Sequence, residues 1–109
     1  GDWLSADEAA QSIWTRDLDL MAAMNVNLVR VYSFDSDNNH TAFLDACEAR
    51  GILVAVTVDY PEDLDYSSAP AKLEWKNRAL AVVARYKSHP AILLWGFGNE
   101  KNYQASTAA

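Results

Sequence analysis

The sequence places an asparagine and a glutamate, Asn99-Glu100, directly after an apolar segment near its carboxyl end. That segment, residues 91–95, has the composition of a buried strand and is followed by Gly96-Phe97-Gly98. An unpaired carboxylate is costly inside a sheet, so an acid in this place belongs at the rim, where parallel α/β proteins bind their ligands. The spacing therefore predicts a functional carboxylate at Glu100.

Glu100 has the properties of a proton donor. Burial beside Trp95 and Phe97 would raise the pKa of its carboxyl group, which then keeps a proton near neutral pH until a leaving group needs it. Asn99 is suited to hydrogen-bond a substrate hydroxyl. The alternatives are a solvated glutamate that begins a following helix and an asparagine that serves only a turn.

The ends of two earlier apolar segments supply further candidates. Arg30 and Tyr32 lie in the first segment, and Asp59 follows the second. A buried arginine needs an acidic partner, so Arg30 either holds a catalytic carboxylate ionised or forms a structural ion pair with Asp59 or another acid. Tyr32 and Trp95 either stack on a sugar face or fill the core.

The sequence predicts no metal site and no cofactor. Asp35, Asp37 and Asp59 are loop acids, but histidines and acids do not occur at ligand spacing. Gly96-Phe97-Gly98 lacks the third glycine or the lysine of phosphate-binding loops, and there is no Gly-x-Ser-x-Gly elbow. Cys47 lies among helix-type apolar positions without an evident histidine partner, which favours a buried structural thiol.

Composition limits the partners. The 109 residues carry a formal net charge of −6, whereas binding to nucleic acid or an anionic membrane needs a basic face. No apolar run approaches the roughly 20 residues of a membrane span. We therefore expect neither a nucleic-acid nor a membrane partner, and room for one small domain.

Strand-like and helix-like apolar patterns alternate along the chain. The predicted strands cover residues 28–34, 52–58 and 91–95, and the predicted helices cover residues 6–24, 41–50 and 71–87. The second and third strands are almost continuously apolar, which is typical of parallel strands covered on both faces. The alternation predicts an α/β fold with a parallel sheet.

Helical spacing also predicts which residues face inward. The expected inner positions are Ile13, Trp14, Leu18, Met21 and Met24 in the first helix, Phe43, Leu44 and Cys47 in the second, and Leu80, Val83, Tyr86 and several alanines in the third. Ser5 or Asp7 is expected to cap the first helix, and Gly51 to end the second. His40 is expected to be a cap or a surface residue.

The segment from His89 to Glu100, with the sequence HPAILLWGFGNE, resembles the fourth strand of the (β/α)8-barrel glycoside hydrolases of clan A. These include cellulase-like, β-galactosidase-like and β-1,3-glucanosyltransferase-like families. Residues 27–32, with the sequence NLVRVY, resemble their second strand, most closely that of the glucanosyltransferase-like group. Asn39-His40 and Ala49-Arg50-Gly51-Ile52 continue the similarity, which covers nearly the whole chain.

The resemblance implies a function and a site. In that clan the glutamate of the Asn-Glu motif is the general acid/base, which corresponds to Glu100, and the asparagine binds the sugar 2-hydroxyl, which corresponds to Asn99. The second-strand arginine supports the nucleophile and corresponds to Arg30. The implied reaction retains configuration, with two carboxylates about 5 Å apart. The implied substrate is a β-linked oligo- or polysaccharide, and the implied location is extracellular or periplasmic.

The chain also departs from that family. The family's nucleophile is a second glutamate on the seventh strand, and no glutamate here occupies a matching position. A complete barrel needs about 250 residues, so residues 1–109 are expected to form an incomplete barrel segment with three parallel strands. The remainder of a barrel, or self-association, would then complete the sheet. The alternative is a non-catalytic module that oligomerises or binds carbohydrate through Trp95, Tyr32 and Tyr60.

Overall fold

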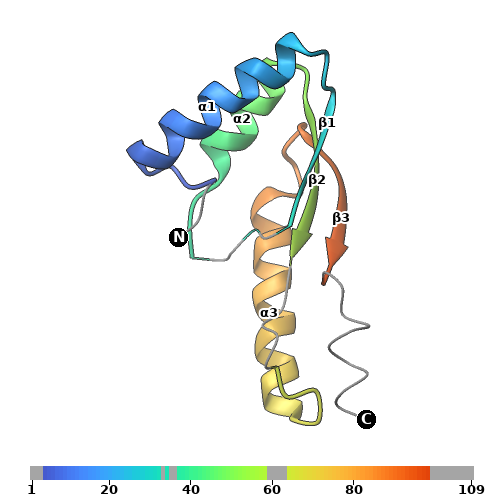
Figure 1. Cartoon of the computed structure of the whole chain (residues 1–109). Helices are drawn as coiled ribbons and strands as arrows, with labels where there is room; N and C mark the ends of the chain where they lie inside the picture. Colours follow the sequence, from blue (N-terminus) through green and yellow to red (C-terminus); the bar gives the residue numbers. More distant parts are fainter. Residues whose placement is uncertain (1–3, 33, 35–36, 59–63, 99–109) are drawn as a thin grey trace.

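The computed structural model describes residues 4–32, 34, 37–58 and 64–98. Three helices alternate with three strands, in the order α1 (Glu8–Ala23), β1 (Leu28–Val31), α2 (Thr41–Ala49), β2 (Leu53–Val58), α3 (Ala69–Tyr86) and β3 (Ile92–Phe97). The strands form one sheet in the order β1-β2-β3 (Figure 1). The predicted alternation of helices and strands is confirmed.

Both strand pairs are parallel. Leu28 of β1 lies opposite Leu53, and Val31 lies opposite Val56. On the other side of β2, Val58 lies opposite Phe97, after a register shift between Val54 and Ala55. Parallel strands linked by helices are the repeating unit of a (β/α)8 barrel. The described residues therefore form an α/β structure consistent with part of such a barrel.

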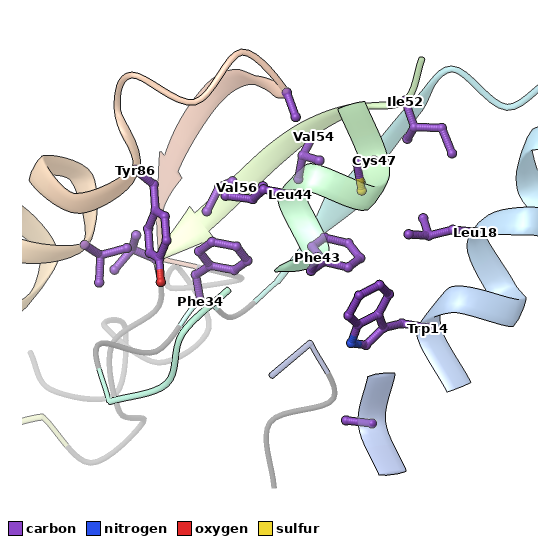
Figure 2. Packing of buried hydrophobic residues seen from close by; sticks show 14 of the residues in the cluster. Trp14, Leu18, Phe34, Phe43, Leu44, Cys47, Ile52, Val54, Val56 and Tyr86 are labelled. Atoms are coloured by element: carbon purple, nitrogen blue, oxygen red, sulfur yellow. The ribbon is translucent and has the colours of Figure 1, made fainter. Parts of the chain in front are cut away.

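The core lies between the helices and one face of the sheet. Val54 and Val56 of β2 are fully buried there, together with Leu44 and Cys47 of α2. Figure 2 shows these side chains gathered between α2 and the sheet, with Trp14 beside Phe43 at one end and Tyr86 beside Phe34 at the other. We call this side of the sheet the covered face.

The ends of the helices follow the local sequence signals. The Asp7 carboxylate accepts a hydrogen bond from Ala10 N at 3.3 Å and caps α1. Gly51 follows α2 with φ at +68°, a left-handed conformation that favours glycine. Pro70 lies in the first turn of α3, whose preceding residue Ser68 accepts from Ala71 N. Within the described residues, no helix is both long and apolar enough to cross a membrane.

The expected inner face of α3 is partly wrong. Tyr86 and an alanine, Ala79, are buried as expected, but the third buried residue is Val82, whereas Leu80 is about half exposed. Positions 79, 82 and 86 lie on one stripe of the helix, and Leu80 lies about 100° around the axis. The buried stripe of α3 runs through Ala79, Val82 and Tyr86, which join the core cluster, and this leaves Leu80 at the surface.

The other two helices fit their predictions more closely. Phe43, Leu44 and Cys47 are all buried in α2. In α1, Trp14 and Leu18 are buried as expected, but the expectation is wrong for Ile13, which is exposed, and for Met24, which is exposed at the helix end.

The strands differ from their predicted limits. β1 ends at Val31 rather than at residue 34, although Phe34 N still donates to Thr57 O at 3.2 Å. β3 extends to Phe97, two residues further than expected. Leu94 and Phe97 are each about half exposed. The described residues therefore cover β2 far more completely than β3.

Candidate active site

The second face of the sheet carries no helix of the described structure. Side chains that lie opposite each other in parallel strands point to the same side, so the strand register identifies the members of this open face. They are Leu28, Arg30, Tyr32, Leu53, Ala55, Thr57, Leu94 and Gly96. Arg30, Ala55 and Leu94 form one level across the three strands, and Thr57 and Gly96 form the next level toward the carboxyl edge.

Two of the predicted site residues lie together on this open face. The Arg30 guanidinium lies over the Tyr32 ring, 4.8 Å from its centroid. This distance is within the range of a cation–π interaction. Both side chains are exposed, and Tyr32 is 60% exposed. The expectation of a buried Arg30 is wrong, because β1 lies at the edge of the sheet and its open face is uncovered.

Trp95 lies on the opposite side of the sheet. It is paired with Val56 of the covered face and packs, partly buried, against the core cluster. This position is the one expected of a tryptophan that fills the core. The structure therefore separates Trp95 from Arg30 and Tyr32.

The carboxyl end of β3 leads directly to the Asn-Glu motif. Gly98 N donates to Val58 O at 2.9 Å, so the pairing of β3 with β2 continues to this residue. Gly98 has φ at +79°, which an L side chain rarely adopts. Asn99, Glu100 and Asp59, together with Tyr60, lie outside the described residues. The strand that precedes the motif thus ends at the same sheet edge as β2.

A buried polar cluster lies beside this edge. His40 is fully buried, and its ring stacks on Phe34 with the centroids 3.9 Å apart. The Tyr86 hydroxyl accepts from His40 N at 2.9 Å and contacts Asn38 O at 3.4 Å. His40 is the N-cap residue of α2, as one of the two expectations had it, although its side chain makes no capping hydrogen bond. The alternative of a surface residue is wrong, because the last residue of α3 covers it. We call the contact between His40 and Tyr86 the clamp. It links residues 46 positions apart in the sequence, and no local sequence pattern reveals it.

One group of three side chains has the composition of a metal site. The ligand atoms of Asp45, Glu48 and His89 lie within 4.8 Å of one another. However, His89 Nδ1 accepts a hydrogen bond from Ala91 N at 3.1 Å, so in the neutral ring Nε2 carries the hydrogen, and it lies 2.7 Å from Asp45 Oδ1. Metal binding at Nε2 would require the opposite tautomer. The group therefore fits a hydrogen-bonded link between α2 and the start of β3.

Cys47 is the chain's single cysteine and is fully buried in the core. Burial raises the pKa of its thiol to about 12, against a smaller lowering effect of Arg50. A thiol with so high a pKa is a poor nucleophile. The prediction of a buried structural cysteine is confirmed.

The fold and the sheet edge define the class of protein. Parallel strands alternating with helices, with an Asn-Glu pair following a strand end, are features of the clan A barrel glycoside hydrolases that the sequence resembles. Comparison with known families agrees with this class. The model of a glycoside hydrolase family described as glucanosyltransferase matches residues 4–109. The chain belongs to this family.

The individual relatives that match this chain are named as β-mannosidase and β-galactosidases. β-Mannosidase B of Thermothelomyces thermophilus is 34% identical over 111 residues, covering 94% of this chain and 12% of that protein. β-Galactosidase of Vibrio cholerae serotype O1 is 29% identical over 100 residues, covering 86% of this chain and 9% of that protein. β-Galactosidase of Priestia megaterium is 29% identical over 97 residues. The chain thus matches about a tenth of the length of these relatives.

Proposed function

We propose that residues 1–109 are an incomplete barrel segment of a retaining glycoside hydrolase or transglycosylase that acts on β-linked glycans. Glu100 is the general acid/base, and Asn99 binds the 2-hydroxyl of the sugar. The observation that carries this proposal is the position of the motif. It follows Gly98, which is still hydrogen-bonded to β2 at the carboxyl edge of a sheet from the glucanosyltransferase family.

The open face supports the remaining roles. In a barrel, the sheet face without helices is the interior, and its carboxyl end opens into the active site. Arg30 and Tyr32 lie on that face, with the guanidinium over the ring. We assign Arg30 to hold the nucleophilic carboxylate ionised, and Tyr32 to contact the sugar. Asp59, which follows β2, would line the same edge.

The nucleophile is proposed to lie outside these residues. Retention of configuration requires two carboxyl groups about 5 Å apart, and no glutamate of this chain matches the second position. The isolated chain is therefore expected not to hydrolyse an aryl β-glycoside. Measurable turnover by this chain, abolished in Glu100→Gln, would contradict this part of the proposal.

The acid/base role is tested in a polypeptide extended to include the second carboxylate. With a substrate whose leaving group needs protonation, Glu100→Gln should lower kcat/KM by about 10²–10⁴-fold. With an activated aryl leaving group, formation of the glycosyl-enzyme should be much less affected. Equal losses for both substrates, or none, would count against Glu100 as the proton donor.

A second candidate function is self-association without catalysis. Leu28, Leu53 and Leu94 are each at least about two-fifths exposed on the open face, and β1 and β3 lie at the two ends of the strand order. Exposed strand edges of this kind favour pairing with another chain. Sedimentation would test this: a monomer at every concentration counts against it.

A further inference from the structure

A small pocket lies away from the open face, between the beginning of α3 and the segment before it. Its volume is about 220 Å³, and it is lined by Leu64, Tyr66, Lys72, Trp75 and Lys76. We call it the Trp75 pocket. It is smaller than the roughly 300 Å³ at the lower end of ordinary ligand pockets, so it has room for one small ring rather than a whole oligosaccharide.

The lining residues come together through helical spacing and a short turn. Lys72, Trp75 and Lys76 are three and four residues apart, so they share one face of α3. Tyr66 reaches this face from a turn in which the Asp65 carboxylate accepts hydrogen bonds from Ser67, including one from Ser67 N at 2.9 Å. These bonds, and more weakly Lys72, lower the pKa of Asp65. The turn thus holds Tyr66 near the helix.

The charges of the pocket favour an anion. Within the described part of the chain, neither Lys72 nor Lys76 lies within 4.0 Å of a carboxylate oxygen, whereas Arg78 is shared between Glu74 and Asp37. Lys72 and Lys76 thus bring two ammonium groups to the pocket, and the nearby Asp65 carboxylate, whose pKa is lowered by Ser67 and more weakly by Lys72, offsets only part of that positive charge. An acidic group would be attracted here from solution.

The aromatic lining favours a ring. Trp75 and Tyr66 offer apolar surface with a polar tip, as many ligand sites do. The Arg78 guanidinium lies 4.9 Å from the centre of the Trp75 ring and helps to hold the indole in place. Apolar rings together with ammonium groups suit a ligand that has an apolar ring face and a negative charge.

We infer that the Trp75 pocket binds a sugar ring that carries a carboxylate, that is, a uronic acid residue of an acidic glycan. This inference rests on the proposed action on glycans and narrows its substrate class. α3 begins after β2 and extends beyond the carboxyl ends of the strands (Figure 1). The pocket therefore lies beyond the same carboxyl ends of the strands as the candidate active site, and it would hold a more distant part of the glycan being cleaved.

The test is a binding experiment on the full chain. The chain is labelled with ¹⁵N, and the indole signal of Trp75, assigned with Trp75→Phe, is followed during titration with methyl β-D-glucuronide. Methyl β-D-glucoside is the neutral control, and glucose 6-phosphate distinguishes a carboxylate from a phosphate. The glucuronide should shift the signal saturably, with an affinity at least tenfold above that of the glucoside, and added salt should weaken it.

Matched variants localise the effect. Lys76→Gln removes one ammonium group from the exposed surface of the pocket and should lower the affinity about fivefold or more. Lys87→Gln, at the other end of α3, should leave it unchanged. No saturable shift, an equal response to the glucoside, a response to glucose 6-phosphate alone, or an unchanged affinity in Lys76→Gln would overturn the inference.

The experiment is independent of catalysis. It needs neither Glu100 nor the second carboxylate, and it can be repeated in Glu100→Gln. A pocket that fails to bind glucuronide while Glu100 behaves as the acid/base rejects only the acidic-glycan inference. Failure of the Glu100 test rejects the proposed function, whatever the pocket binds.

Discussion

The two faces of the sheet are built from the same three strands but differ in what covers them and in how far their side chains are exposed. On the covered face, Val54 and Val56 are fully buried under Leu44. On the open face, Arg30 and Leu94 are exposed, although the small Ala55 between them is buried. The covered face explains how the segment folds. The open face contains the side chains to which we assign chemistry, and it is the face that the interior of a barrel would enclose.

The largest expected effect is the loss of folding stability when a leucine is shortened on the covered face, compared with the same change on the open face. Leu44 is fully buried, whereas Leu94 is 51% exposed. Leu44→Ala should lower the free energy of unfolding of the isolated chain by about 3–4 kcal/mol, because it leaves a cavity in the core. Leu94→Ala should cost less than about 1 kcal/mol. Urea denaturation followed by circular dichroism measures both, and equal losses would mean that the open face is covered in solution.

The clamp beside the sheet edge should give the next largest effect. Tyr86→Phe removes the hydroxyl that accepts from the buried His40 N. An unsatisfied buried donor costs about 1–3 kcal/mol, so the free energy of unfolding should fall by about that amount. Tyr32→Phe, on the open face, is the matched control and should change it by less than about 0.5 kcal/mol. Equal losses of stability in Tyr86→Phe and Tyr32→Phe would contradict the claim that the Tyr86 hydroxyl makes a stabilising buried hydrogen bond.

The buried thiol gives a smaller, pH-dependent test of the covered face. Burial raises the pKa of Cys47 to about 12 from 9.0. Between these values the unfolded chain loses a proton that the folded chain keeps, so this group's contribution to stability declines as the pH rises above about 9. The denaturation midpoint should therefore fall more steeply with pH in the wild type than in Cys47→Ala. Parallel pH profiles would show that the thiol is not buried as described.

The fold was largely predictable from the sequence. The three strands and three helices follow from apolar runs and helical spacing, and the ends of the helices follow from Asp7, Gly51 and Pro70. The rotation of α3 did not follow. Leu80 and Val83 form a stripe at least as apolar as that of Ala79 and Val82, and only the tertiary packing of the core decides which stripe is buried.

The candidate site was predictable only in part. Strand alternation places Arg30 and Tyr32 on the same face of the sheet, but it does not say which face is covered. The predicted burial of Arg30 was therefore wrong. Burial of His40 depends on Tyr86, which follows 46 residues later in the sequence. Long-range contacts of this kind leave no periodic signal. For Trp95 the sequence allowed two positions, in the core or at the sugar site. The strand register places Trp95 against the core.

The most direct test of the central claim is chemical rescue of Glu100→Ala in a polypeptide extended to include the second carboxylate. An aryl β-glycoside with a good leaving group should form the glycosyl-enzyme, which then hydrolyses slowly because no general base activates water. Azide needs no general base, so it should accelerate turnover and yield a β-glycosyl azide. Wild-type rates in Glu100→Ala, or turnover that azide does not change, would contradict the role of Glu100 as the acid/base.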